Sequence, residues 1–208
     1  MSFDPRLIDM VMRLRSRGVS DSRVLRAVEQ TPRRPFLPDD MQARAYDEAA
    51  VPVQCGQTAL APLDAARLLQ VLRAGPDDKA LFIGSGTGWT AAVLSRLCRR
   101  VYAVERYVGL VRAADAVLAA QALHKVEIRH GDGRYGWPGQ APFSRIVFGC
   151  AVRAVPDKVM DQLAREGRLV AVVDGQLTLF EKARTRVTET AIAPMTLPMI
   201  EAGKSRAL

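Results

Sequence analysis

Two kinds of hydrophobic pattern divide the chain at about Lys79. Before this point, apolar residues recur at intervals of three and four, which is the spacing of one face of an α-helix. The first helix is expected between Asp4, which can cap its start, and Gly18, which can end it. Ser20 is expected to cap a second helix, and a third helix is expected after Pro62. The N-terminal part therefore reads as helical.

A connector rich in proline separates the second helix from the third. The prolines of the run 31–38 lack amide donors and restrict the residues that precede them. Neither helix can continue through this run. It is expected to lead into a loop at 51–58.

After Lys79, short apolar runs alternate with helical segments. Strands are predicted at 80–83, 100–104, 125–129, 144–148, 168–173 and 177–181, and helices at 89–97, 108–122 and 158–165. Strands joined by crossover helices pair in parallel, so the pattern predicts an α/β fold with a doubly wound, mostly parallel sheet. The last strands, 177–181 and 185–193, have no helix between them and are expected to form an antiparallel pair. The N-terminal helices are expected beside the carboxyl edge of the sheet.

Length and composition are consistent with this organisation. A chain of 208 residues with 49% hydrophobic and 25% charged residues can bury a sizeable core, so we expect one domain. Residues 1–60 would form an N-terminal helical extension with a loop, 61–200 the sheet core and 201–208 a frayed tail.

Charge and hydropathy restrict the partners. The net charge is +8, but Arg and Lys are interleaved with Asp and Glu, so we expect weak attraction to acidic substrates and no specific nucleic-acid partner. No apolar run approaches the roughly 18 residues of a membrane span, and the first ten residues lack the layout of a secretory signal. A cytoplasmic protein without membrane contact is expected.

The cysteines point away from disulfides and metals. Cys55, Cys98 and Cys150 are odd in number and lack Cys-x-x-Cys spacing. Buried free thiols are the expectation, and no metal site is predicted.

A glycine-rich turn follows the first predicted strand of the sheet and opens the next helix. It consists of Gly84, Ser85, Gly86, Thr87 and Gly88. This is where an α/β fold binds its ligand, and glycine allows close approach of a ligand to the backbone. The spacing is neither the G-x-G-x-x-G dinucleotide fingerprint nor a P-loop, which disfavours NAD and nucleoside triphosphates. A tight turn needs glycine whatever it binds, so this motif alone is weak evidence.

Two acids extend the candidate site. Glu105 ends the next strand about 20 residues beyond the turn, where an exposed carboxylate can accept hydrogen bonds from both hydroxyls of a ribose. An ordinary surface glutamate is the alternative. Asp132, between Gly131 and Gly133, could meet an adenine amino group or serve only as a turn residue. Together these features describe a nucleoside without phosphates, which fits S-adenosylmethionine.

The chain resembles the protein-L-isoaspartate (D-aspartate) O-methyltransferases from about residue 8 to residue 182. The motifs that carry the resemblance include Thr31-Pro32-Arg33, Gly56-Gln57-Thr58, the glycine turn, Val101-Tyr102-Ala103-Val104-Glu105, Gly131-Asp132-Gly133 and Gly136-Trp137-Pro138. Gly-Gln-Thr ahead of a helix, combined with Gly-Asp-Gly and Gly-Trp-Pro, is the most specific part.

The resemblance implies a Rossmann-like methyltransferase fold that transfers a methyl group from S-adenosylmethionine to the carboxylate of a damaged aspartyl residue, leaving S-adenosylhomocysteine. Proteins or peptides with isoaspartyl residues would be the partners. Thr58 would lie near the acceptor. The residues around the cofactor would be Gly84, Ser85, Gly86, Thr87, Gly88, Glu105, Asp132 and Gly133.

Two positions depart from the family pattern. Leu60 stands at the serine of Gly-Gln-Thr-x-Ser-x-Pro, so the hydroxyl that the family places beside the acceptor carboxylate is missing. Phe82 stands where the family has an acid that helps to anchor the methionyl end of the cofactor. An arginine such as Arg153 would have to supply a counter-charge for the acceptor. The alternatives are a catalytically impaired or non-catalytic homologue that binds a cofactor or partner, and a methyltransferase for another acceptor.

Overall fold

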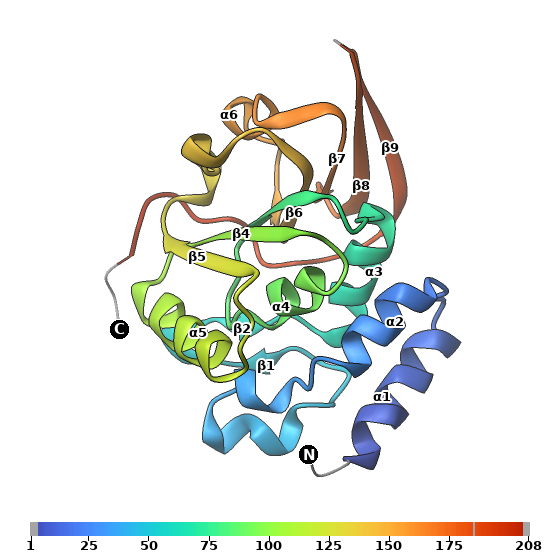
Figure 1. Ribbon diagram of the computed structural model, residues 1–208, viewed down its shortest axis with the longest axis vertical. Helices are drawn as coiled ribbons and strands as arrows, with labels where there is room; N and C mark the ends of the chain where they lie inside the picture. Colours follow the sequence, from blue (N-terminus) through green and yellow to red (C-terminus); the bar gives the residue numbers. More distant parts are fainter. Residues whose placement is uncertain (1–3, 185, 206–208) are drawn as a thin grey trace.

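Within the described residues, 4–184 and 186–205 of the computed structural model, a seven-stranded sheet has the order β5-β4-β3-β6-β7-β8-β9 (Figure 1). The strands are β3 (Lys79–Ile83), β4 (Arg100–Glu105), β5 (Val126–His130), β6 (Phe143–Val152), β7 (Leu163–Val173), β8 (Gln176–Ala183) and β9 (Arg186–Pro194). Strands β3 to β7 pair in parallel, and β8 and β9 continue the sheet antiparallel. The predicted doubly wound, mostly parallel sheet with its antiparallel C-terminal pair is confirmed.

The helices and the remaining short elements surround this sheet. The helices are α1 (Pro5–Ser16), α2 (Ser22–Glu29), α3 (Pro62–Leu72), α4 (Trp89–Ser95), α5 (Val108–Ala120) and α6 (Asp157–Met160). The 3-10 helices are η1 (Arg34–Phe36), η2 (Asp39–Arg44), η3 (Gln54–Gly56), η4 (Gly133–Tyr135) and η5 (Pro138–Gln140). Strands β1 (Val51–Pro52) and β2 (Thr58–Ala59) form a separate two-stranded antiparallel sheet. No helix of the described residues is both long and apolar enough to cross a bilayer.

The helix starts follow capping chemistry. Asp4 caps α1 as predicted, and its carboxylate accepts a hydrogen bond from Arg6 N at 3.1 Å. The cap of α2 is Asp21 rather than the predicted Ser20, and Asp21 accepts from Arg23 N at 2.9 Å. Both residue types satisfy the free amides of a first turn, so the sequence alone does not select between neighbours.

Alternation along β3 builds two cores. Ala80 and Phe82 belong to the core beneath α3, α4 and α5, whereas Leu81 and Ile83 belong to the core on the opposite face, where α6 packs. Burial on both faces explains why the strands are continuous apolar runs. Helices α3, α4 and α5 thus cover one face of the sheet, and α6 lies over the other.

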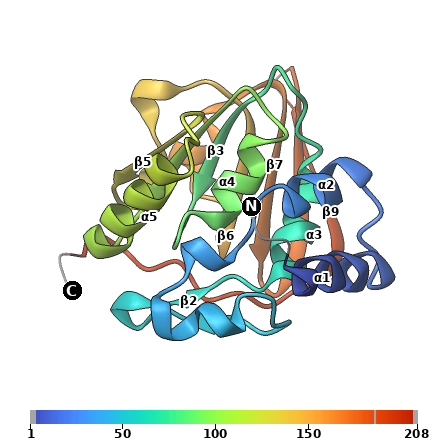
Figure 2. The same ribbon diagram turned by 60° about the horizontal axis from the view of Figure 1, so that its bottom comes forward.

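The strand order reverses at β3, because β4 lies on one side of it and β6 on the other. At such a switch point the connections leave in opposite directions, and a crevice opens at the carboxyl ends of the strands. The segment with β1 and β2 borders this crevice, whereas α1 and α2 pack against α3 (Figure 2).

One predicted helix is wrong in length. Instead of a helix at 158–165, α6 ends at Met160, and the chain already pairs with β6 at Leu163, opposite Phe143. A buried Leu163 is compatible with a helix or with a strand. Its pairing with Phe143 of β6 makes it the start of a strand. The predicted strand start at residue 185 lies outside the described residues.

Candidate active site

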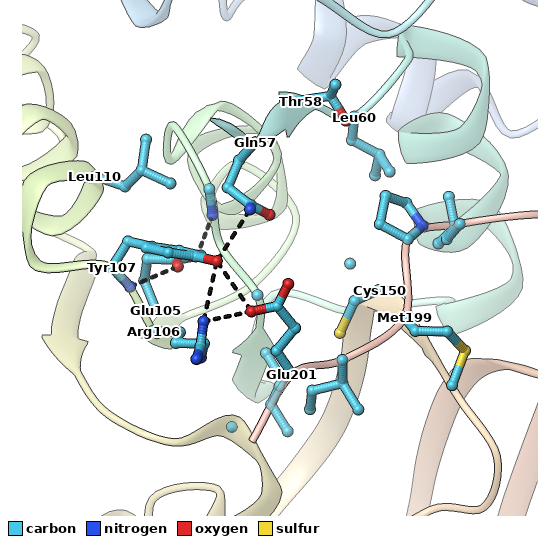
Figure 3. A pocket seen from close by; sticks show the side chains of 18 of the residues that line it. Gln57, Thr58, Leu60, Glu105, Arg106, Tyr107, Leu110, Cys150, Met199 and Glu201 are labelled. Atoms are coloured by element: carbon cyan, nitrogen blue, oxygen red, sulfur yellow. Dashed lines mark hydrogen bonds and ion pairs between the residues drawn. The ribbon is translucent and has the colours of Figure 1, made fainter. Parts of the chain in front are cut away.

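A cleft of about 160 Å³ lies at the carboxyl ends of β3, β4 and β6 (Figure 3). The glycine turn and Glu105 form its floor, while Gln57, Thr58 and Leu60 border it from the N-terminal segment. Residues 196–201 complete it from the C-terminal side. Segments far apart in sequence therefore meet at the switch point, as ligand sites of α/β folds do.

The glycine turn needs its glycines for conformation and for space. Gly84, Gly86 and Gly88 have φ angles of 76°, 54° and 85°, in the left-handed region that favours glycine. No atom lies within 4 Å of where a Cβ on Gly86 would stand, so its backbone is open to the cleft. Ser85 and Thr87 line a smaller cavity behind the turn.

Glu105 is buried, with 5% of its surface exposed, and not the exposed carboxylate that the sequence suggests. Its Oε2 accepts the backbone N–H of Gly86 at 2.8 Å, and its Oε1 accepts that of Tyr107 at 3.0 Å. Each oxygen retains a further lone pair. The carboxylate therefore fixes the glycine turn to β4 and still borders the cleft, where it can accept hydroxyl donors.

Asp132 lies just behind the cleft wall, which Gly133 lines. Its carboxylate accepts from Arg134 Nη2 at 2.7 Å and from Gly203 N at 2.8 Å. Burial acts to raise the pKa of Asp132, but these hydrogen bonds outweigh it and hold the pKa below its ordinary value. The charge of Asp132 is therefore largely satisfied by the protein. A contact with adenine remains a prediction.

The two positions that depart from the family pattern have different surroundings. Leu60 lines the cleft beside Thr58. Phe82 has 1% of its surface exposed and points into the core, and a Cβ on Gly149 would stand 2.9 Å from its ring. Arg153 is exposed and is not among the residues that line the cleft.

Tyr107 organises the rim of the cleft, and sequence reasoning missed it. Its hydroxyl accepts from Arg106 Nη1 at 3.0 Å and from Gln57 Nε2 at 3.1 Å, and it donates to Glu201 Oε2 at 3.1 Å (Figure 3). Arg106 also pairs directly with Glu201. Burial and the hydrogen bond with Glu201 raise the pKa of Tyr107. The position of Tyr107, two residues after Glu105, is the one sequence signal for it.

The C-terminal segment is held against the site, although the sequence predicts a frayed tail from residue 201. Arg106 Nε donates to Gly203 O at 3.1 Å, and Ser205 N donates to Arg106 O at 3.0 Å. His130 Nε2 lies 2.8 Å from the same carbonyl of Arg106. Residues 196–201 thus form one wall of the cleft, and 202–205 are held beside it, while residues 206–208 lie outside the described residues.

Two further groups on the cleft wall were missed. Asp64, in the first turn of α3, has its pKa raised by burial. Burial also raises the pKa of Cys150 to about 12, so its thiol stays protonated at neutral pH and is a poor nucleophile. Cys98 is buried as predicted, whereas Cys55 and Cys150 are half-buried.

Comparison with known proteins shows the family of this chain. A sequence model of the protein-L-isoaspartate (D-aspartate) O-methyltransferase family matches residues 6–198. The chain belongs to this family. It is 43% identical over 209 residues to the protein-L-isoaspartate O-methyltransferase of Maricaulis maris, covering 99% of this chain and 98% of that one. It is 42% identical over 189 residues to the protein-L-isoaspartate O-methyltransferase of Rhodospirillum rubrum, covering 90% of this chain and 86% of that one.

Solved structures of this family share the fold. A protein-L-isoaspartate O-methyltransferase superposes with a TM-score of 0.84 at 22% identity, covering 94% of this chain and 66% of that longer one. A putative member from Plasmodium falciparum, in complex with S-adenosyl-L-homocysteine, superposes with a TM-score of 0.78 at 20% identity, covering 93% of this chain and 97% of that one. The predicted methyltransferase fold is confirmed.

The residues present fit the S-adenosylmethionine of this family. Glu105 presents a buried carboxylate with free lone pairs, and Gly86 leaves open backbone beside it. These two would hold the nucleoside, with Gly84 and Gly133 on the same wall. These roles, and those predicted for Thr58, Ser85, Thr87, Gly88 and Asp132, stay predictions.

Proposed function

We propose that this chain is an S-adenosylmethionine-dependent enzyme that methylates the carboxylate of isoaspartyl residues in damaged proteins, in the cytoplasm. The observation that carries the proposal is the buried Glu105 carboxylate, which is bonded to Gly86 N at 2.8 Å in the cleft of a chain that matches the family over residues 6–198. The match supports the reaction, and the cleft supports cofactor binding.

The chemistry requires little from the protein beyond positioning. When bound, S-adenosylmethionine supplies an electrophilic methyl group. The acceptor carboxylate has an ordinary pKa near 4 and is already ionised at about pH 7, so no general base is needed. The residues of the cleft orient the two ligands and exclude water, which together can lower a barrier by roughly 7–11 kcal/mol. Cys150 takes no covalent part, because its pKa is about 12.

The departures at Leu60 and Phe82 are compatible with this activity. Loss of one positioning hydroxyl at Leu60, by analogy with loss of an oriented donor, costs about 3 kcal/mol, or roughly 100-fold in rate, which does not abolish a reaction. Phe82 is part of the core. Asp64 places another carboxylate on the cleft wall, where it can meet a cationic ligand group. A non-catalytic homologue is therefore less well supported.

The experiment combines cofactor binding with methyl transfer. Calorimetry should show binding of S-adenosylmethionine and S-adenosylhomocysteine, and radiolabelled methyl groups should enter an isoaspartyl peptide. Glu105→Ala should weaken binding of both cofactor forms. Cofactor binding without transfer to this peptide would contradict the proposed acceptor, and absence of binding would contradict the proposed enzyme.

A further inference from the structure

Arg33 is a completely buried cation in the connector between α2 and η1. Its Nη1 donates to Ala45 O at 3.1 Å, and its Nη2 donates to Leu60 O at 2.8 Å. The guanidinium also lies over the ring of Trp89, with Cζ 5.3 Å from the centroid. Backbone carbonyls and an aromatic face therefore hold this charge in place.

No carboxylate pairs with Arg33 within the part of the chain that the structure describes. Burial lowers the pKa of Arg33 to about 10, against an opposite effect of Asp47, so the guanidinium is still charged at neutral pH. A buried charge without a counter-charge costs several kcal/mol. Such a cation needs an explanation beyond packing.

A small cavity borders this cation behind the glycine turn. Arg33 Nε and Ser85 Oγ are both buried without a hydrogen-bond partner among the described residues, and both residues line this cavity of about 40 Å³. The cavity shares Thr58, Leu60 and Gly86 with the main cleft, so the two adjoin. A charged N–H and a hydroxyl on one small cavity are suitable donors for an oxyanion.

We propose that this cavity is an anion subsite, in which Arg33 Nε and Ser85 Oγ bind a ligand carboxylate that enters from the main cleft. The inference rests on the proposed function, whose two ligands each carry a carboxylate: the methionyl end of the cofactor and the methyl acceptor. Phe82 and Leu60 form apolar walls of the cavity. An ion pair inside such walls is stronger than in water.

Binding measurements with matched ligands test the subsite without turnover. S-adenosylhomocysteine is compared with its decarboxylated analogue, which keeps the ammonium and the nucleoside but lacks the carboxylate. An isoaspartyl peptide is compared with the same peptide carrying a carboxamide in place of that carboxylate, in the presence of the decarboxylated analogue. Each pair is titrated into the full-length protein and into Arg33→Met. Arg34→Met removes the charge of the exposed neighbouring arginine and is the control.

If the cofactor carboxylate occupies the subsite, the protein should prefer S-adenosylhomocysteine about 10- to 100-fold, the usual range for a hydrogen bond to a charged group. Arg33→Met should remove this preference, and Arg34→Met should keep it. If the acceptor occupies the subsite, the same pattern should appear in the peptide pair alone. Equal affinities within both pairs would overturn the subsite and leave a hydrated cavity.

A second variant keeps the test decisive if Arg33→Met does not fold. Ser85→Ala removes one hydroxyl. It should reduce the preference for the ligand with the carboxylate several-fold and leave the affinity for the decarboxylated analogue unchanged. An unchanged preference in Ser85→Ala would remove Ser85 from the subsite and contradict the proposal as stated. Equal ligand affinities with intact methyl transfer would overturn only the subsite, whereas failure of S-adenosylhomocysteine to bind at all would overturn the proposed function too.

Discussion

The backbone N–H of Gly86 donates to Glu105 Oε2 at 2.8 Å and so joins the glycine turn to the end of β4. The same carboxylate also accepts from Tyr107 N, at Oε1. Glu105 therefore has two tasks: it fixes the turn, and it presents acceptor lone pairs to the cleft. Both tasks should be visible when the side chain is shortened.

Glu105→Ala should lower stability and cofactor affinity together. Buried amides left without a partner cost about 1–3 kcal/mol, and loss of a hydrogen bond to a charged group should weaken S-adenosylhomocysteine binding by about 1.5–3 kcal/mol. Denaturant unfolding and calorimetry measure the two effects. Glu127→Ala, a half-exposed carboxylate on β5, is the control and should change neither. A Glu105→Ala protein with full stability and affinity would remove Glu105 from the site.

Gly149→Ala should destabilise the fold through a steric conflict. A Cβ at this position would stand 2.7 Å from Gly84 O and 2.9 Å from the ring of Phe82. Overpacking of this kind costs about 1–3 kcal/mol. Gly139→Ala is the matched control, because nothing lies within 4 Å of its added methyl group. Equal unfolding midpoints for the two variants would show that the strand end adapts without cost.

Asp64→Asn should become more stabilising as the pH rises. Burial raises the folded-state pKa of Asp64, so ionisation disfavours the folded state. Below the unfolded-state pKa of about 3.9, the carboxyl is neutral in both states, so its ionisation does not lower the free energy of unfolding. As the pH rises from this value through the raised folded-state pKa, the free energy of unfolding of the parent protein falls. Unfolding free energies at about pH 4 and pH 7 test this sign. The exposed Asp9→Asn is the control, and a difference that shrinks with pH would contradict the assignment.

Glu201→Ala should loosen the C-terminal wall of the cleft. The variant loses the partner of Arg106 and of the Tyr107 hydroxyl. Hydrogen exchange at the amides of Gly203 and Ser205 should accelerate only a few-fold, because an exposed ion pair contributes about 0–1 kcal/mol. Glu189→Ala, on the exposed strand β9, should leave both amides unchanged. Unaltered exchange in Glu201→Ala would mean that the backbone bonds alone hold this segment.

The pattern of apolar residues predicts the strands of the sheet but not the extent of every helix. Strands buried on both faces appear in the sequence as short continuous apolar runs, so β3 and β4 were placed closely. The region of α6 was misjudged because pairing of Leu163 with Phe143, far away in sequence, overrides a local helical pattern.

Part of the candidate site could be placed from the sequence, whereas its electrostatics could not. Motif spacing selects Gly86 and Glu105 as candidates, and the structure brings them together. Burial of Glu105 depends on backbone donors that the sequence does not display. Arg33 is a stronger case, because arginine is almost never fully buried and the motif containing it gives no sign of burial.

The central claim is that this cleft transfers a methyl group to isoaspartyl carboxylates. Its most direct measurement is incubation with S-adenosylmethionine and an equimolar pair of isomeric peptides, one with isoaspartate and one with aspartate at the same position, followed by mass spectrometry of both. We expect a mass gain of one methylene unit on the isoaspartyl peptide, an equal yield of S-adenosylhomocysteine, and no gain on the aspartyl isomer. Equal modification of both isomers, or none of either while S-adenosylhomocysteine binds, would contradict the account.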